Sequence, residues 1–137
     1  MLDHQFQSIV AISLVQSIRT FSDCEIFPQK WEWGWKFYIY MPHIGQVHLH
    51  IPNNQPGRAV ISDLVVLQHV RGQGHGRRLI SLCETLANFL EADALGIWAD
   101  PEDWQVNWYQ RLGFHYCGAN PEATTDIYLE KPLKTQK

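Results

Sequence analysis

The sequence predicts an α/β protein, and three patterns support that fold class. A short β-branched and aliphatic run over residues 60–67 has the length of a buried strand. Apolar residues then recur three and four positions apart over 79–90, as they do on one face of a helix. Apolar and polar residues alternate over 31–41 and over 47–51, which indicates a hairpin. At 137 residues and 15.9 kDa the chain fits one domain, residues 1–137.

The remaining elements follow from the same kinds of pattern. Residues 3–21 carry apolar side chains at helical spacing behind a capping Asp3, so we expect a helix, although the alternation over 10–14 also fits a strand. The cluster PNNQPG at 52–57 predicts a turn before the central strand. The later elements expected are a strand over 95–99, a helix over 103–112, and strands over 114–117 and 126–130.

The first strand of the hairpin is rich in aromatic residues. The residues expected to share one of its faces are Trp31, Trp33, Trp35, Phe37, Ile39 and Met41. Alternating aromatic residues on a strand are most often core or interface residues, so we expect the three tryptophans to pack. An aromatic slot for a substrate is the alternative.

The segment RGQGHGRR, residues 71–78, joins the central strand to its helix. Glycine at every second position lets the backbone turn tightly and bring several N–H groups onto one ligand. The helix N-terminus that follows adds unpaired N–H groups and partial positive charge. No Asp or Glu occurs over 64–83, while the segment contains three arginines, so we expect a phosphate or diphosphate ligand. A plain turn with solvated arginines is the alternative.

Two common phosphate-binding motifs do not fit this spacing. A Walker loop requires Lys followed by Ser or Thr after its last glycine, and here Arg77 and Arg78 occupy those positions. A dinucleotide-binding fingerprint counted from Gly72 requires a third glycine where the chain has Arg77. The phosphate compound is therefore of another kind.

Arg71, Gly74 and Gly76 match the pattern R-x-x-G-x-G, which resembles the acyl-CoA signature Q/R-x-x-G-x-G/A of the GNAT superfamily of N-acetyltransferases. The segment NWYQRLGF, residues 107–114, is similar to the Tyr-x-x-x-Gly-Phe segment of that family. The resemblance covers residues 60–118, about half of the chain. It implies a GNAT-like mixed, mostly antiparallel central sheet with splayed central strands and helices on both faces.

The resemblance implies an acetyl-CoA-dependent N-acetyltransferase. Acetyl-CoA would be the co-substrate, no metal would take part, and the acceptor would be a primary amine of a small molecule or a protein. A non-catalytic acyl-CoA-binding or protein-interaction domain with the same fold is the alternative, and nucleotide binding is a third.

The resemblance also implies a set of cofactor-binding residues. The central strand and the next one would part over 63–67 and 96–99, so that the pantetheine arm pairs with the exposed backbone like an added strand. The diphosphate would lie on the glycine loop. The cofactor-binding residues expected on this basis are Leu64, Val66, Leu67, Arg71, Gly72, Gln73, Gly74, His75, Gly76 and Arg77.

Two residues are expected to be catalytic. In the family pattern Tyr109 holds the place of the acid that reprotonates the departing thiolate, and packing between helix and sheet is the alternative. Asp63, on the central strand, is the expected general base, acting directly or through water, and a purely structural role is the alternative. His48 and His50 on the neighbouring hairpin are the other candidates for the base.

Composition limits the partners. A net charge of −3 and a pI near 6.1 argue against nucleic acid as a partner. Cys24, Cys83 and Cys117 lie far apart, so they build neither a disulfide framework nor a Cys-x-x-Cys metal site, and a reducing cytoplasm is the expected location. The longest apolar stretch, 9–15, is too short for a membrane span.

A metal ion and a second copy of the chain are the remaining candidate partners. His43, His48 and His50 have no carboxylate or cysteine at ligand spacing nearby, so we expect substrate-facing or exposed imidazoles and no metal. The abundance of aromatic residues is compatible with a homodimer. The acceptor substrate does not follow from the sequence.

Overall fold

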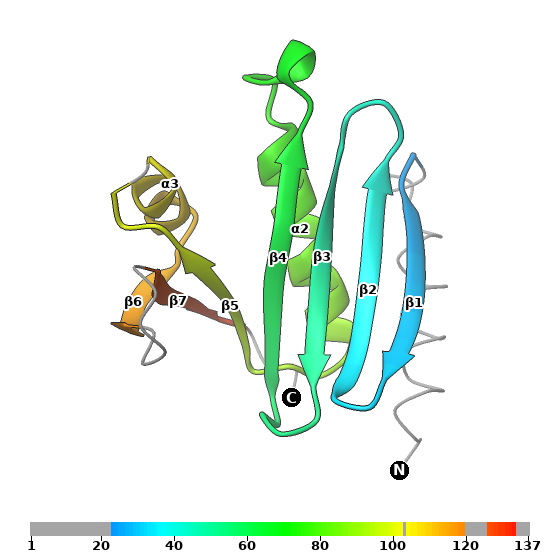
Figure 1. Ribbon diagram of the computed structural model, residues 1–137, viewed down its shortest axis with the longest axis vertical. Helices are drawn as coiled ribbons and strands as arrows, with labels where there is room; N and C mark the ends of the chain where they lie inside the picture. The colour runs from blue at the N-terminus through cyan, green and yellow to red at the C-terminus, as the bar shows by residue number, and fades with distance from the viewer. Residues whose placement is uncertain (1–22, 103, 120–125, 134–137) are drawn as a thin grey trace.

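The computed structural model describes residues 23–102, 104–119 and 126–133, so the helix expected over 3–21 lies outside them. Across these residues, seven strands form one sheet in the order β1-β2-β3-β4-β5-β7-β6 (Figure 1), and only the β4–β5 pair is parallel. The strands are β1 Glu25–Trp31, β2 Gly34–Met41, β3 Gly45–Pro52, β4 Arg58–Val66, β5 Ala94–Ala99, β6 His115–Ala119 and β7 Ile127–Pro132. The helices are η2 Gln68–Val70, α2 His75–Phe89 and α3 Gln105–Arg111. The predicted fold class is confirmed.

The predicted first strand of the hairpin begins at the wrong residue. The alternation from residue 31 runs across a turn, because β1 ends at Trp31 and β2 begins at Gly34. Gly34 has φ +148, and a side chain there would overlap the Ile51 carbonyl oxygen, so the chain reverses where only glycine fits. Trp31 and Trp33 are 42% and 41% exposed, whereas Trp35 packs in the core as expected.

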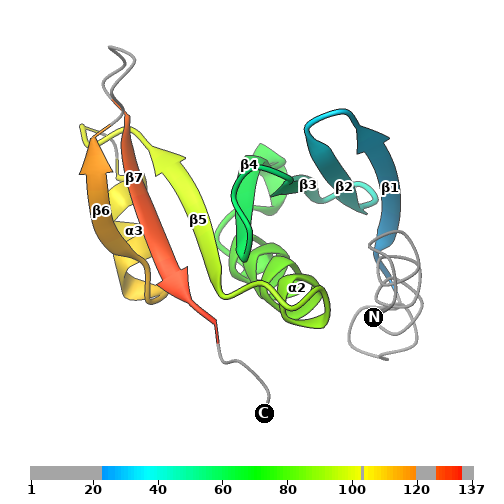
Figure 2. The same cartoon turned by 90° about the horizontal axis from the view of Figure 1, so that it is seen from below.

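Helix α2 supplies the main covering layer of the sheet. Figure 1 shows it behind β3 and β4, and Figure 2 shows it beneath β4. Its apolar face carries Leu79, Leu82 and Leu86, which are completely buried together with residues of the strands such as Phe37 and Leu49. Burial of an aliphatic side chain of this size contributes about 1.5–3 kcal/mol, so this layer holds the glycine loop at the helix start in place.

Strand β4 contains one extra residue at Asp63. Its register with β3 shifts between Gln46 and His48, and Asp63 has φ +53, a left-handed conformation. Ala59 and Ile61 face the core before this bulge, and the even-numbered residues 64 and 66 face it afterwards. The bulge therefore brings two consecutive side chains, 62 and 63, to the face opposite the core.

The pairing of β4 with β5 is short. It runs from Arg58 opposite Ala94 to Ile61 opposite Ile97 and then ends, so the edge of β4 that faces β5 is unpaired over 62–66. Figure 1 shows β5 turning away from β4 beyond this point. The sheet thus splits at the same place as the bulge, where the sequence resemblance placed the splayed strands.

Gly45 provides a test of the packing at the bulge. A Cβ at this position would overlap the main-chain carbonyl oxygen of Val65 on the neighbouring strand. Gly→Ala normally stabilises a protein by about 0.4–1 kcal/mol where the backbone accepts it. We expect Gly45→Ala to destabilise instead, by about 1–3 kcal/mol, because the backbone of β4 must move. Urea unfolding followed by circular dichroism checks this, and an increase in stability would contradict the close approach.

Candidate active site

A cavity of about 730 Å³ lies between the end of β4, the glycine loop and α3, and we call it the loop cavity. Its lining residues are Leu64, Val65, Val66, Arg71, Gly72, Gly74, His75, Gly76, Arg77, Trp104, Gln105, Trp108 and Tyr109. Gly76 packs closely against α3, since a Cβ at this position would lie 3.3 Å from the Trp108 ring. The loop cavity therefore depends on the contact between the start of α2 and α3.

The N-terminus of α2 opens into the loop cavity. Gly72 and Gly74 have φ +79 and φ +84, and space is open where their side chains would be. The first helical bond runs from the Arg78 N–H to the Gly74 carbonyl, 3.1 Å, so the N–H groups of 75–77 precede it. The first turn contains no acidic residue and no side-chain cap. This is the arrangement that binds anions at helix N-termini.

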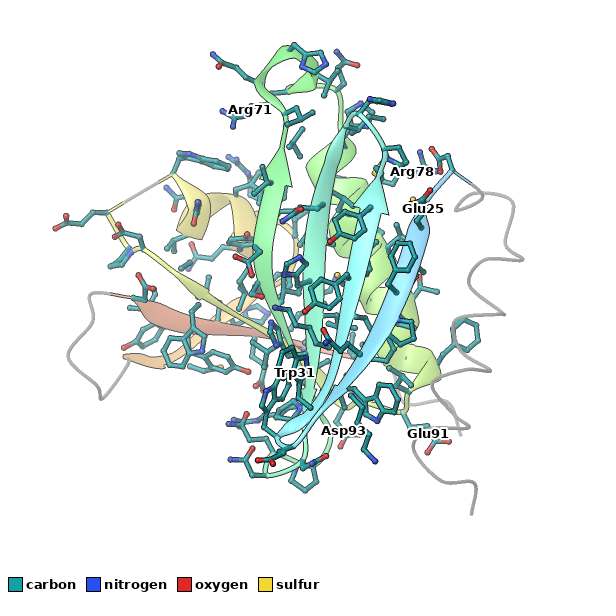
Figure 3. All side chains as sticks on the ribbon, turned by 45° about the vertical axis from the view of Figure 1, so that its right-hand side comes forward. Glu25, Trp31, Arg71, Arg78, Glu91 and Asp93 are labelled. Carbon is teal, nitrogen blue, oxygen red and sulfur yellow. The ribbon has the colours of Figure 1, made fainter. Side chains whose placement is uncertain are left out.

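The arginines of the loop have different roles. Arg71 donates from Nε to the Val66 carbonyl, 2.8 Å, which ties the loop to the end of β4. Arg77 is exposed and lines the loop cavity. Arg78 forms an ion pair with Asp23 and points to the side of β1, away from Arg71 (Figure 3). The cluster of basic charge that faces the cavity is therefore smaller than the sequence suggests.

Most of the residues predicted to bind the cofactor line the loop cavity. Leu67 and Gln73 do not, and the Leu67 N–H donates to the Ile44 carbonyl, 2.8 Å. Neighbouring residues of a strand direct their main-chain groups to opposite edges, so the Val66 N–H faces away from β3, toward the cavity. The bond from Arg71 to the Val66 carbonyl is consistent with this direction.

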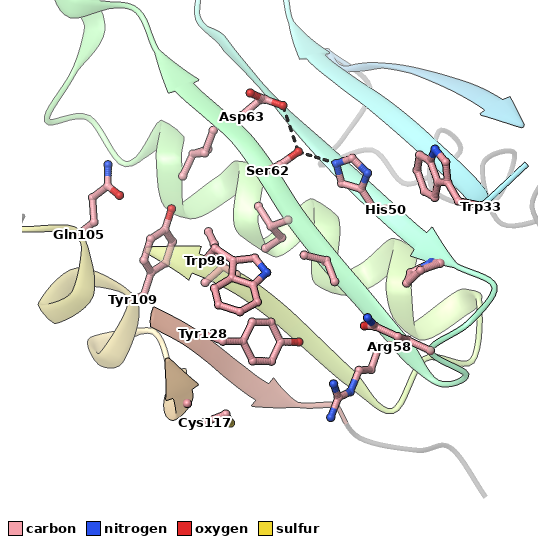
Figure 4. A pocket seen from close by; sticks show the side chains of 17 residues that line it. Trp33, His50, Arg58, Ser62, Asp63, Trp98, Gln105, Tyr109, Cys117 and Tyr128 are labelled. Carbon is pink, nitrogen blue, oxygen red and sulfur yellow. Dashed lines mark hydrogen bonds between the residues drawn. The ribbon is translucent and has the colours of Figure 1, made fainter. Parts of the chain in front are cut away.

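A second cavity of about 860 Å³ lies where β4 and β5 part (Figure 4), and we call it the strand cavity. It is lined by Trp33, His50, Pro52, Gln55, Arg58, Val60, Ile61, Ser62, Asp63, Leu64, Ile97, Trp98, Gln105, Tyr109, Cys117, Gly118 and Tyr128. Leu64, Gln105 and Tyr109 line both cavities. The two cavities therefore meet at these three residues, beside the unpaired edge of β4.

Tyr109 stands at the junction of the cavities. Its ring is 4% exposed and packs between Trp108 and Phe114, with ring centroids 5.0 and 5.7 Å apart. Burial, with a smaller effect of Cys83, raises the pKa of Tyr109 to about 12, so the phenol keeps its proton at neutral pH. Figure 4 shows its hydroxyl turned toward the β4 side of the strand cavity. The ring thus packs between helix and sheet, and its hydroxyl is at the cavity.

A chain of hydrogen bonds crosses the top of the strand cavity. His48 Nδ1 and Ser62 Oγ each lie 3.1 Å from Asp63 Oδ2, and His50 Nε2 lies 2.5 Å from Ser62 Oγ. A carboxylate only accepts, so Ser62 and His48 donate to it. Because the Ser62 proton is used in this way, its oxygen accepts from the His50 Nε2–H (Figure 4). Asp63 therefore accepts directly from His48 and Ser62, and the bond from His50 reaches it through Ser62.

The family of the chain follows from its sequence match. Residues 34–116 match the family described as acetyltransferase (GNAT) domain, and this match spans more than half of the 137 residues. The chain belongs to the GNAT acetyltransferase family. Among curated proteins, none matches this sequence.

Solved structures show the same fold at low identity. The IAA acetyltransferase from Bacillus cereus is 16% identical, with 80% of this chain and 99% of that chain covered and a TM-score of 0.64. A GNAT family acetyltransferase from Elizabethkingia anophelis with acetyl-CoA bound is 16% identical, with 81% and 99% covered and a TM-score of 0.61. Nourseothricin acetyltransferase is 23% identical, with 75% and 67% covered and a TM-score of 0.60.

In this GNAT domain, the members of the hydrogen-bonded chain differ in their charge at neutral pH. Burial and Lys36 lower the pKa of His48, and its Nε2 is buried without a partner among the described residues, so a second proton there would be unsatisfied. Burial, Lys36 and His48 lower the pKa of His50 to about 4. Burial alone would raise the pKa of Asp63, but the hydrogen bond from Ser62 and the presence of His48 hold it below its ordinary value. At neutral pH, Asp63 is charged and both histidines are neutral.

Several residues of this GNAT site were not predicted. Ser62, Trp98 and Tyr128 line the strand cavity, and Trp104 and Trp108 line the loop cavity. The one signal in the sequence for these residues is that Ser62 directly precedes Asp63, the predicted base. Trp33 lines the strand cavity, as the aromatic-slot alternative requires.

The described residues also bear on metals, cysteines and membranes. They contain no group of three or more His, Cys, Asp or Glu side chains that could hold a metal ion. Cys24, Cys83 and Cys117 are free. None of the described helices has the length and apolar character needed to cross a membrane.

His50 gives a prediction about pH. Between an unfolded pKa near 6.5 and the folded value of about 4, the unfolded chain binds more protons than the folded one. The free energy of unfolding therefore falls as the pH falls through this window. We expect His50→Gln to remove about 1 kcal/mol of that loss, less than the full shift implies, because the ring is partly exposed. Urea unfolding at pH 7 and pH 4 checks this. An NMR titration of the imidazole with a midpoint near 6.5 would contradict it.

Proposed function

We propose that this GNAT domain is an acetyl-CoA-dependent N-acetyltransferase that acts on a primary amine of a small molecule or a protein. The observation that carries the proposal is the junction of two cavities at Leu64, Gln105 and Tyr109. One cavity contains a helix start without an acidic residue or a side-chain cap, where an anion would bind, and the other contains a charged carboxylate. A thioester from one side and an amine from the other would meet beside the hydroxyl of Tyr109.

The loop cavity would hold coenzyme A. Its diphosphate would lie on the N–H groups of the loop and of the first turn of α2, with Arg77 as an exposed charge partner. Arg71 is bonded to the Val66 carbonyl, so it would support the loop and contact phosphate with its remaining N–H groups. The pantetheine arm would extend along the unpaired edge of β4 toward the junction. The N–H near Val66 would then be the donor to the thioester oxygen.

Tyr109 would act as the general acid. Its buried phenol stays protonated until a thiolate forms beside it, and it stands where the leaving sulfur would be. A pKa of about 12 makes proton donation unfavourable in isolation, so the role requires that C–S cleavage and proton transfer occur together.

Asp63 would attract the ammonium form of the amine and accept its proton, directly or through water. The carboxylate is ionised at neutral pH and 58% of its side chain is exposed. His50 is the alternative base, because it is neutral and lines the same cavity. His48 is less suited, since its Nδ1 is bonded to Asp63 and its Nε2 is buried.

The adjacent arginines of α2 allow a matched test of coenzyme A binding. We expect Arg77→Ala to weaken acetyl-CoA binding about three- to tenfold, because a charge partner of the phosphates is lost. Arg78→Ala removes the same charge one position away, where the guanidinium is paired with Asp23, and should leave the affinity within about twofold. Isothermal titration calorimetry with acetyl-CoA checks both variants. Equal weakening would assign the effect to net charge, and absence of binding in the unmodified chain would overturn the proposal.

Tyr109→Phe tests catalysis apart from binding. We expect kcat to fall about 100-fold or more while acetyl-CoA affinity changes little, because the ring and its packing are retained. Tyr116→Phe is the control, since Tyr116 is 58% exposed on β6 and lines neither cavity. Release of free CoA thiol with a panel of amines is the measurement. Unchanged turnover would remove Tyr109 from the mechanism, and acetyl-CoA binding without turnover of any amine would indicate a binding domain.

A further inference from the structure

The wall of the strand cavity formed by β5 and β7 is aromatic and open. Trp98 of β5 and Tyr128 of β7 are direct partners across the two strands, with ring centroids 5.0 Å apart and planes inclined by 47°. Trp98 lines the strand cavity and is 41% exposed. Trp33, also 41% exposed, faces the cavity from the β1–β2 turn and packs on His50 with centroids 5.4 Å apart.

The Trp98–Tyr128 wall is fixed in position. Tyr128 lies so close to the backbone of β5 that a side chain at Gly96 would overlap its hydroxyl. The hydroxyl donates to Glu130 Oε2, 2.9 Å, and the Arg58 guanidinium lies over the ring, 5.9 Å from its centroid. Arg58 Nε is in turn 3.5 Å from Glu130 Oε2. Contacts with Gly96, Glu130 and Arg58 thus hold the Tyr128 ring in place before a ligand arrives, which reduces the entropy lost when a ligand packs against it.

The charges of the strand cavity limit its ligand. Of the described residues that line it, the charged ones are Asp63 and Arg58. Arg58 is engaged by Glu130 and Tyr128, and Asp63, on which the charge of Lys36 also acts, is the one carboxylate in this lining. One carboxylate can neutralise one ammonium group. A polyamine or an aminoglycoside would bring several cations against a single acid and a guanidinium.

We propose that the acceptor is a monoamine carried on an aromatic ring, an arylalkylamine, whose ring stacks on Trp98 and Tyr128 while its ammonium group faces Asp63. This inference rests on the function proposed above. Figure 4 shows Trp98 and Tyr128 side by side below β4, with Asp63 and Ser62 on β4 itself. A carboxylate next to the amine would be brought close to Asp63, and like charges repel. Arylalkylamines are therefore preferred over the corresponding amino acids.

The chemical step is balanced for such an acceptor. The ammonium loses one proton to Asp63 or water, and its nitrogen forms a bond to the acetyl carbon while the C–S bond breaks. A second proton from nitrogen is lost as the amide forms, and the departing sulfur gains one. The products are the N-acetyl arylalkylamine, coenzyme A with a free thiol, and one proton released to solvent.

A panel of acceptors tests the inference with the full chain and saturating acetyl-CoA. Tryptamine and 2-phenylethylamine are compared with spermidine, an aminoglycoside, L-tryptophan and n-butylamine by thiol release. We expect kcat/KM for the two arylalkylamines to exceed that for the other compounds by about tenfold or more. A higher value for spermidine, the aminoglycoside or L-tryptophan would overturn the inference while the proposed function stands. Failure of acetyl-CoA to bind would overturn both.

A variant pair tests the ring contact itself. We expect Trp98→Ala to raise the KM for tryptamine about fivefold or more and to leave the KM for acetyl-CoA unchanged, because Trp98 lines only the strand cavity. The same variant should change kcat/KM for n-butylamine, which has no ring, by less than about twofold. Phe27→Ala removes a side chain that is 51% exposed on β1 and lines neither cavity, so it should affect neither amine. An equal loss for tryptamine and n-butylamine with Trp98→Ala would contradict the stacking.

Discussion

Asp63 holds a left-handed backbone conformation, φ +53, which costs a residue with a side chain about 1 kcal/mol or more. Hydrogen bonds from His48 and Ser62 to its carboxylate favour this conformation. Without the extra residue, strict alternation from Ala59 and Ile61 would direct the Asp63 side chain toward α2. The bulge therefore moves a carboxylate from the core side of β4 to a cavity, and it directs Leu64 and Val66 toward the core while Val65 and Leu67 are exposed.

The pairing of β4 with β5 ends at Ile61, just before this bulge. Unpaired strand edges are usually a liability, because they pair with other chains. Here the free edge lies inside the molecule, between the glycine loop on one side and the rings of Trp108 and Tyr109 on the other. An extended ligand with amide groups, such as pantetheine, can satisfy it from within. The bulge, the free edge and the junction of the two cavities thus lie together on one part of β4.

The sequence predicts those parts of the fold that depend on local pattern. Helix α2, the β2–β3 hairpin and the glycine loop are recognisable because periodicity and glycine spacing act within a few residues. The turn at Gly34 escapes notice because the alternation continues across it. The polar pair Ser62 and Asp63 interrupts the apolar run over 60–67, but it does not by itself indicate a bulge, since the conformation of Asp63 is set by pairing with β3. Trp98 and Tyr128 meet only through β5–β7 pairing, 30 residues apart in sequence, and no local signal joins them.

The groups on either side of the junction have pKa values shifted in opposite senses, and each shift has its own structural cause. Burial between α3 and the sheet raises the pKa of Tyr109, whereas donated hydrogen bonds keep the pKa of Asp63 low despite partial burial. Environments that separate the pKa values of neighbouring groups are typical of acid–base sites. In the proposed reaction, the Asp63 carboxylate is charged before an amine arrives and would attract its ammonium form. In the proposed reaction, the phenol would keep its proton until the C–S bond breaks beside it, and the proton would pass to the leaving sulfur as that bond is broken. Under this proposal, the bulge places the residue that would bind the amine, and the packing of α3 places the residue that would donate the proton.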